Sequence, residues 1–401
     1  MDMITENKVV PKLRFREFND YWNNYLLGNI AEFLKGKGIS KSELDDDGKT
    51  ECIRYGELYV YYNELIDEVK SKTNLENTVL SKANDVIIPA SGETQLDIAT
   101  CSCVLRSGIA LGGDLNIIRT KNNGLFLSYY LNSKKKFDIA RLSQGSSVVH
   151  IYASQLKKLN LNLPSLIEQK KVASFLSAVD EKLKQLTKKK ELSEDYKKGI
   201  MQKIFSREIR FKDDNGNNYS NWEKKRLEEV IYFFNGKGHE QDVSSDGLFI
   251  IVNSKFISTN GKVKKYTNLQ KCPLQKDNIV MVMSDVPNGK ALAKCYYIEK
   301  DNLYSLNQRI CSLKQKSINM RFLFYLLNRN KYFLKFDSGV GQTNIKKSEV
   351  LSCPLYIPSS IKEQQSIAEF FTEIDKKIEF VSHQLEKTKE FKKGLLQQMF
   401  V

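Results

Sequence analysis

An internal duplication constrains this chain more than any other feature. Residues 168–205 reappear as residues 363–400 without a gap, at an offset of 195. The segments before them also match, at an offset of 200, so that Trp22 reappears as Trp222. A duplication with such a long period implies two equivalent structural units. We therefore expect two similar objects in one molecule, which suggests a reader of a bipartite target.

The composition indicates a basic globular protein. The 401 residues leave room for two or three domains, and 41% hydrophobic with 28% charged residues is ordinary for a folded chain. The formal net charge of +15 is not ordinary, and a field of this sign attracts polyanions. A basic protein without such a partner is the competing interpretation of the charge alone.

The cysteines, histidines and apolar runs exclude several classes. Seven scattered cysteines fit a reducing compartment better than a disulfide framework, so we expect a cytoplasmic protein. Cys101 and Cys103 form the only close pair, and no histidine lies near them with metal-ligand spacing. No stretch has the length of a signal-peptide core or of a membrane span.

The repeat divides the chain into four segments. Two of them, residues 1–163 and 208–357, read as globular domains in which short β-branched runs alternate with turn signals such as Asn260-Gly261. Each also has one helix-like stretch, at Phe126–Leu131 and at Phe322–Leu327. The fold class that we predict is α+β, with two similar mixed α/β domains related by an internal pseudo-two-fold repeat.

The other two segments, residues 164–207 and 358–401, predict long helices. Each has about 40 residues without an internal proline, or ~60 Å of helix. Their apolar residues step by four and three, which is typical of a coiled-coil seam. The seam residues are Val172, Leu176, Val179, Leu183 and Leu186 in the first segment and Ile367, Phe371, Ile374, Ile378, Val381 and Leu385 in the second. We expect the two helices to pair antiparallel and to hold the domains apart, while pairing with a separate chain stays open.

The seam then changes phase in both segments. The later apolar residues are Leu192, Tyr196, Ile200 and Ile204 in the first helix and Phe391, Leu395 and Met399 in the second. A phase change alters the local supercoil without ending it. The first helix carries a surplus of 4 positive charges and the second carries none, so 11 of the 15 excess charges lie elsewhere. If the chain binds a polyanion, the globular domains are expected to do so.

Motifs for catalysis are absent from the sequence. None of the seven prolines is followed by proline, which excludes the Asn/Asp-Pro-Pro-aromatic motif of enzymes that methylate the amino group of a base. None is followed by aspartate, which excludes the Pro-Asp start of a metal-dependent nuclease motif. No glycine-rich loop has the spacing needed to cradle a phosphate. None of the three histidines is repeated between the halves. The chain therefore looks like a binder that performs no reaction.

At this point the repeated motifs carry a resemblance. The pattern Pro-Ser-X-X-Glu-Gln followed by an apolar heptad and an aspartate occurs at Pro164–Leu183 and again, with one additional serine after the proline, at Pro358–Ile378. Each copy ends in a Gly-Ile/Leu-Met/Leu-Gln run closed by phenylalanine, at Phe205 and Phe400. This double signature resembles the conserved regions of specificity subunits of type I restriction-modification systems.

The resemblance implies a division of labour. Each globular domain would be a target-recognition domain that reads one half of an asymmetric, bipartite site in double-stranded DNA, and the helices would set the spacer. The conserved regions would dock two modification (methyltransferase) subunits, and two ATP-dependent restriction subunits would complete the nuclease. S-adenosylmethionine, ATP and Mg are expected on those partners, and this chain would hold no cofactor and no metal.

Candidate DNA-binding residues lie in polar loops of both domains, where a few side chains can reach base edges while others contact phosphates. In the first domain they are Lys37, Arg54, Tyr55, Ser91, Gly92, Thr94, Gln144, Ser146, Ser147 and His150. In the second they are Lys237, Asn253, Ser254, Lys255, Ser284, Asn288, Lys290, Gln342, Thr343 and Asn344. The seam residues Val172, Leu176, Val179, Leu183, Ile367, Phe371, Ile374 and Ile378 are the candidates for the coiled coil and for subunit docking.

Two other functions stay open. The chain could be a non-catalytic basic scaffold whose domains grip an RNA or an acidic protein. It could also be a nuclease or methyltransferase without a recognisable motif, although the proline inventory disfavours this.

Overall fold

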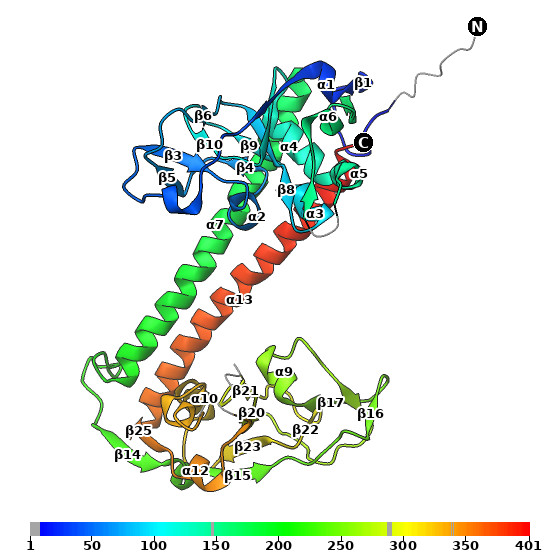
Figure 1. Ribbon diagram of the computed structural model, residues 1–401. Coiled ribbons are helices and arrows are strands. Elements are labelled where there is room, and N and C mark those ends of the chain that lie inside the picture. Colours follow the sequence, from blue (N-terminus) through cyan, green and yellow to red (C-terminus); the bar gives the residue numbers. More distant parts are fainter. Residues whose placement is uncertain (1–8, 146–147, 287–290, 338, 340) are drawn as a thin grey trace. The chain divides into compact units, whose positions relative to one another are not determined.

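The computed structural model describes residues 9–145, 148–286, 291–337, 339 and 341–401 (Figure 1). The chain forms two compact units. Unit 1 comprises Met1–Lys188 and Ser382–Val401, and unit 2 comprises Lys189–Val381. Two long helices, α7 (Leu166–Phe205) and α13 (Ile361–Gln398), each contribute one part to each unit. Both lie within the segments for which the sequence predicts long helices.

Two main sheets build the globular part of unit 1. The larger has the strand order β2 (Ala31–Lys35), β11 (Leu115–Thr120), β7 (Asp85–Pro89), β9 (Ser102–Val104) and β4 (Leu65–Ile66). The smaller has the order β5 (Ser71–Thr73), β3 (Thr50–Ile53), β10 (Ala110–Leu111) and β6 (Val79–Leu80). Two strand pairs, β1 (Asn23–Leu26) with β13 (Asn160–Leu163) and β8 (Ser91–Gly92) with β12 (Val149–His150), complete the described strands.

Helix α4 (Gly124–Ser133) packs across the larger sheet of unit 1. Asn123 caps it by accepting a hydrogen bond from the Phe126 amide at 2.8 Å, as expected for an N-cap side chain. Its rings enter a core that also contains Val86 and Ile118 from the sheet. The shorter helices of this unit are α1 (Leu27–Ile30), the 3₁₀ helix η1 (Lys41–Glu43), α2 (Glu57–Val60), α3 (Gln95–Ile98), α5 (Lys136–Leu142) and α6 (Ala153–Leu156).

Unit 2 repeats this plan. Its larger sheet has the order β15 (Ile231–Asn235), β23 (Ile310–Gln315), β19 (Ile279–Val282) and β21 (Cys295–Tyr297). A second sheet has the order β16 (Val243–Ser244), β18 (Tyr266–Thr267), β17 (Phe249–Val252) and β22 (Tyr304–Leu306). The strand pairs are β14 (Trp222–Arg226) with β25 (Pro354–Pro358) and β20 (Ser284–Asp285) with β24 (Thr343–Asn344). The helices are α8 (Leu227–Val230), α9 (Ser254–Ser258), α10 (Met320–Leu327), α11 (Lys331–Leu334) and α12 (Lys347–Leu351).

The order of elements confirms the predicted repeat of one α+β domain. Strands β15, β23, β19 and β21 correspond in sheet order to β2, β11, β7 and β9. The single helix-like stretch of each domain is α4 in unit 1 and α10 in unit 2, and Asn319 caps α10 as Asn123 caps α4. Cys103 lies on β9 and Cys101 just before it, and both side chains are buried.

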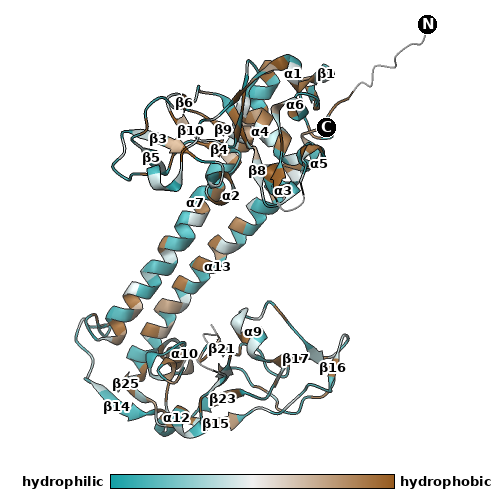
Figure 2. Cartoon of the chain, in the orientation of Figure 1, coloured by the Kyte–Doolittle hydropathy of each residue, from teal (hydrophilic) through white to brown (hydrophobic). Residues whose placement is uncertain are grey.

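The two long helices run antiparallel in each unit. In unit 2, Lys197 of α7 forms an ion pair with Asp375 of α13, and further along α7 the ring of Phe205 lies 5.9 Å from the ring of the earlier residue Phe371. In unit 1, Lys392 lies 2.7 Å from Asp180. Figure 2 shows apolar and polar residues alternating along both helices, as a helix with one apolar stripe requires.

The seam residues have more partners than a simple coiled coil provides. Val172, Leu176 and Val179 are buried in one core with side chains of the globular part of unit 1. Ile367, Phe371 and Ile374 are buried in the same way in unit 2, while Leu183 and Ile378 are half-buried. The globular parts therefore cover these faces together with the other long helix.

The predicted change of seam phase is wrong for three residues. Leu192, Tyr196 and Phe391 are 55%, 57% and 53% exposed, whereas Ile204, Leu395 and Met399 are buried. The buried group lies where a globular part adds a second partner to the helix. In the exposed group, Tyr196 and Phe391 adjoin Lys197 and Lys392, whose side chains do contact a globular part, so these two rings lie on another face of their helices.

Candidate nucleic-acid interface

Two short strands gather polar loop residues in unit 1. Strands β8 and β12 pair antiparallel with Ser91 opposite His150, and the Ser91 hydroxyl lies 3.0 Å from Nδ1 of that histidine. The main chain of Gln144 exchanges two hydrogen bonds with His150. Tyr59 donates its hydroxyl to the Ser91 carbonyl at 2.7 Å. The structure thus brings together four of the predicted residues, which are Ser91, Gly92, Gln144 and His150.

Unit 2 builds the same strand pair from different side chains. Strands β20 and β24 place Ser284 opposite Asn344 and Asp285 opposite Thr343. The Gln342 amide donates to the Ser284 hydroxyl, and the Thr343 hydroxyl donates to Asp337 at 3.1 Å. Predicted residues from two distant loops therefore meet here as well.

A glycine just after the first strand of the larger sheet lets a second loop approach closely in each unit: the loop between β10 and β11 in unit 1, and the loop between β22 and β23 in unit 2. A Cβ atom at Gly36 would lie 1.8 Å from the Gly112 carbonyl oxygen, and one at Gly236 would lie 2.0 Å from that of Asn307. Only glycine fits such a close approach. The first glycine of Gly36-Lys37-Gly38 and of Gly236-Lys237-Gly238 thus has a packing role.

A cavity of 220 Å³ in unit 2 joins the glycine loop to the strand pair. It is lined by Asn235, Gly236, Met283, Ser284, Arg309, Ile310, Asn344 and Ile345. Sequence reasoning missed Arg309, because nothing in its local pattern distinguishes it from other basic loop residues. The neighbouring Lys237 is exposed, and the described part of the chain offers its ammonium no hydrogen bond or ion pair.

Other predicted residues have structural roles or lie apart from the strand pairs. Thr94 caps α3 by accepting from the Asp97 amide, and Asn253 caps α9 by accepting from the Phe256 amide. Lys37 donates to the Asn77 carbonyl at 2.8 Å. The remaining described candidates are Arg54 and Tyr55, just before α2, and Ser254 and Lys255, in α9. Ser146, Ser147, Asn288 and Lys290 lie outside the described residues.

A buried ion pair attaches each globular part to the start of a long helix. Arg14 and the Trp22 indole both donate to the Glu168 carboxylate, whose side chain is 2% exposed. Arg210 and Trp222 repeat this arrangement around Glu363. These contacts account for the glutamate of the repeated Pro-Ser-X-X-Glu-Gln signature. The repeated signature puts both glutamates near the beginning of the predicted helical segments, but nothing in the sequence pattern indicates their arginine partners.

The glutamine of the signature ties α4 and α10 to the long helices. The side-chain oxygen of Gln169 accepts from the Asn123 amide at 3.0 Å, and its side-chain nitrogen donates to the Pro164 carbonyl at 2.9 Å. Gln364 makes the same two contacts, to the Asn319 amide and the Pro358 carbonyl. Both halves of the signature therefore position a globular part on its helix.

A third repeated contact joins α4 or α10 to both long helices. Tyr129 donates its hydroxyl to Asp180 at 2.5 Å, and Lys392 lies 2.7 Å from the same carboxylate. Burial and the hydrogen bond to Asp180 raise the pKa of Tyr129. Tyr325, Asp375 and Lys197 form the corresponding contact in unit 2. The predicted repeat thus extends to individual hydrogen bonds.

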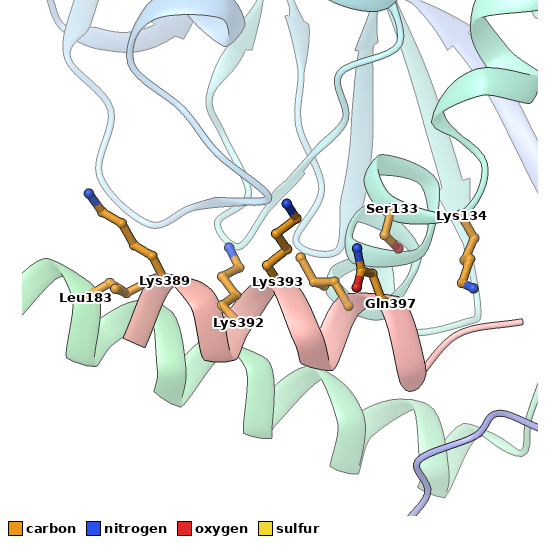
Figure 3. Close-up of a pocket in the computed structure, with 8 residues that line it drawn as sticks. Ser133, Lys134, Leu183, Lys389, Lys392, Lys393 and Gln397 are labelled. Carbon is orange, nitrogen blue, oxygen red and sulfur yellow. The ribbon is translucent and has the colours of Figure 1, made fainter. Parts of the chain in front are cut away.

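A basic cavity of 430 Å³ lies beside Lys392 in unit 1. It is lined by Ser133, Lys134, Leu183, Lys389, Lys392, Lys393, Leu396 and Gln397. Figure 3 shows Lys389, Lys392 and Lys393 rising from the same side of α13. Lys392 is neutralised by Asp180 and Glu64, and Lys389 by Glu386. The cavity is therefore less basic than its composition suggests.

Neither a metal centre nor a membrane helix is found among the described residues. No group of three or more His, Cys, Asp or Glu side chains is placed there to hold an ion. No helix in that part of the chain is both long and apolar enough to cross a bilayer.

Comparison with known proteins identifies a family. The family model of the type I restriction modification DNA specificity domain matches twice, at residues 19–194 and 219–390. The type I restriction enzyme MjaVIII specificity subunit of Methanocaldococcus jannaschii is 26% identical over 402 residues, which cover 94% of this chain and 91% of that protein. The two copies of the family model coincide with the repeat that the sequence predicts.

Solved structures share the fold. The type I restriction-modification S subunit from M. genitalium has a TM-score of 0.66 at 18% identity and covers 98% of this chain and 99% of its own. A chain from work on complex assembly and conformational transition of the type I R-M system has a TM-score of 0.53 at 14% identity, with 94% and 97% covered. With two family matches that together span most of its length, this chain belongs to the family of type I restriction-modification DNA specificity subunits.

Proposed function

We propose that each globular part of this chain reads one half of a bipartite, asymmetric site in double-stranded DNA. The observation that carries the proposal is the strand pair built twice with different side chains. His150 and Gly92 stand in unit 1 where Asn344 and Asp285 stand in unit 2. A shared framework with unlike polar groups suits two readers of different base sequences.

The affinity for DNA would come from the positive charge outside the long helices. Phosphate contacts from Lys and Arg supply affinity and register, while base contacts supply sequence. Lys237 suits the first task, because its exposed ammonium has no partner in the described part of the chain and lies next to the cavity residue Gly236. The formal charge of +15 supports the same assignment.

The long helices would set the spacer between the half-sites and dock two modification subunits. The predicted docking residues of the seam are largely buried within this chain, so a partner subunit would have to contact other side chains. Tyr196 and Phe391 suit this role. They occupy equivalent positions of the repeat, 195 residues apart, and both are more than half exposed. Two equivalent aromatic anchors fit two copies of one partner.

The chain itself would perform no reaction. The methyl transfer, with S-adenosylmethionine, and the ATP- and Mg-dependent cleavage would belong to the modification subunits and to two restriction subunits. The described cysteines support this in part, because burial raises the pKa of the Cys103 thiol to about 12 and leaves it a poor nucleophile.

The experiment that tests this function is an exchange of one globular part. Residues 212–356 are replaced by the corresponding part of another family member, and the genomic methylation pattern is sequenced in cells that carry the full system. We expect one half of the methylated site to change while the other half and the spacer stay. A change in both halves would contradict the proposal.

The alternative partner, an RNA or an acidic protein, predicts a different result. A sequence-specific DNA complex strengthened by the modification subunits supports the DNA reader. Equal binding to any polyanion, with no effect of those subunits, would favour the scaffold. The salt dependence of binding, compared for the specific site and for random DNA, separates the two.

A further inference from the structure

Asp114 and Arg309 occupy the same place in the two units. In unit 1 the Asp114 carbonyl accepts a hydrogen bond from the Ala90 amide at 2.7 Å, and the Ala90 carbonyl accepts one from Ile151 at 3.0 Å. In unit 2 the Arg309 carbonyl accepts from the Met283 amide at 3.0 Å, and Met283 in turn accepts from Ile345 at 2.8 Å. Both residues therefore sit beside the strand pair, at corresponding points of the repeat.

Both residues also have an uncommon backbone conformation. Their φ angles are +57° for Asp114 and +67° for Arg309, in the left-handed region. Aspartate is several-fold enriched there, whereas arginine is not. Left-handed non-glycine residues cluster at functional sites, where the surrounding structure holds them in place. The backbone conformation at this position is therefore the same in both units, while the side chain differs.

The guanidinium of Arg309 is available to a ligand. The residue is exposed and lines the 220 Å³ cavity together with Ser284 and Asn344. In the described part of the chain no hydrogen bond or ion pair engages its side chain. Arg14 and Arg119, by contrast, are held in bidentate contacts with buried carboxylates.

We propose that Arg309 reads a guanine in the half-site bound by unit 2. The inference rests on the proposed DNA-reading function and deepens it. Arginine donates two parallel hydrogen bonds to O6 and N7 of guanine in the major groove, the commonest specific contact of proteins with a base. Asp114 has no donor for those atoms, so unit 1 cannot read guanine through this position. The side chain at this position is negative in unit 1 (Asp114) and positive in unit 2 (Arg309). The two half-sites should therefore differ at the corresponding base pair.

The test compares two variants of the full chain, assembled with its modification subunits, by selection from a random DNA library. Arg309→Lys keeps the positive charge but loses the bidentate fork. Arg309→Asn removes the charge and suits the left-handed backbone. We expect both variants to lose preference for guanine at one position of one half-site, by roughly 10- to 100-fold. The other half-site should be unchanged.

Arg226→Asn is the matched control, because Arg226 is an exposed arginine on β14. It should leave the selected sequence as it is. Uniformly weaker binding by Arg309→Asn with an unchanged motif would show a phosphate contact and overturn the proposal, as would no effect at all. If the unaltered complex selects no motif, the DNA-reading function itself fails, and this outcome is distinct from a loss confined to one position.

Discussion

The ammonium of Lys392 lies 2.7 Å from the carboxylate of Asp180, so that the last turns of α13 are joined to the first half of α7 within unit 1. Burial alone would lower the pKa of Lys392, but Glu64 and Asp180 outweigh it and raise the pKa above its ordinary value. The contact is partly buried and connects three elements, since Glu64 belongs to the globular part.

Removing this lysine should destabilise unit 1. Lys392→Met leaves Asp180 and Glu64 without their cation, and the loss of one partner of a buried pair costs about 3 kcal/mol. Chemical denaturation, with hydrogen exchange to locate the loss, measures the effect. Lys197→Met in unit 2 is the matched control, and its cost should be smaller because Asp375 is 39% exposed. Equal losses in the two units would contradict the prediction that the more buried Lys392 contact contributes more to stability than the Lys197 contact.

The ion pair between Arg14 and Glu168 offers a second test. Arg14→Met leaves the buried carboxylate with only the Trp22 indole as a donor among the described side chains, and we expect a loss of about 3 to 5 kcal/mol. Adding Glu168→Gln to this variant should recover part of the stability, because the glutamine carries no charge. Urea denaturation of both variants measures the difference. No recovery in the double variant would mean that packing of Arg14 matters more than its charge.

Stability should fall as the solution becomes alkaline. Burial raises the pKa of Cys52 to about 11, and those of Cys311 and Cys353 to about 12. An unfolded thiol titrates near 8.5, so this stability is complete below about pH 8.5 and is lost as the pH rises toward the folded values. Each thiol contributes up to about 1.4 kcal/mol per pH unit in that window. Urea midpoints measured with reductant from pH 7.5 to 10.5 should decrease, and less steeply in Cys311→Ala.

The repeat, the long helices and the main strands could be predicted because their signals are local or repeated. The spacing of four and three residues predicts α7 and α13, and short β-branched runs predict β7, β17 and β19. The partner of Glu168 could not be predicted, since Arg14 lies 154 residues away in the sequence. A charge pattern along one helix does not show which distant loop will cover it.

The candidate site was only partly predictable for a similar reason. Strands β8 and β12 have two residues each, too few for an alternating pattern, and their pairing depends on the surrounding fold. Arg309 stands in the short loop between β22 and β23, which has no turn signature of its own, and its relation to Asp114 appears only when the hydrogen bonds of both units are compared. The exposure of Tyr196 was missed because the spacing of apolar residues does not show which of them face the partner helix and the globular part.

An exposed aromatic on each long helix should carry the docking of modification subunits. Tyr196→Asp and Phe391→Asp place a charge on a surface that is already solvated, so folding should change little. Each should weaken assembly with a modification subunit by tenfold or more, measured by analytical ultracentrifugation. Ile374→Asp is the contrasting variant, because this side chain is 8% exposed and its replacement should unfold unit 2. Normal assembly of the double aspartate variant would place the docking surface elsewhere.

Lengthening both long helices should change the spacer and nothing else. Seven residues are inserted into α7 after Lys188 and seven into α13 after Val381. Each insertion lengthens its helix by about 10.5 Å. It also adds nearly two full turns, so the apolar stripes before and after the insertion stay aligned to about 20°. With 3.4 Å per base pair, the methylated site should gain about three base pairs between its halves. Methylation sequencing reads the result directly. An insertion into α7 alone is the control, because it misaligns the two helices and should abolish methylation. If both insertions together left the spacer unchanged, the helices would not set it.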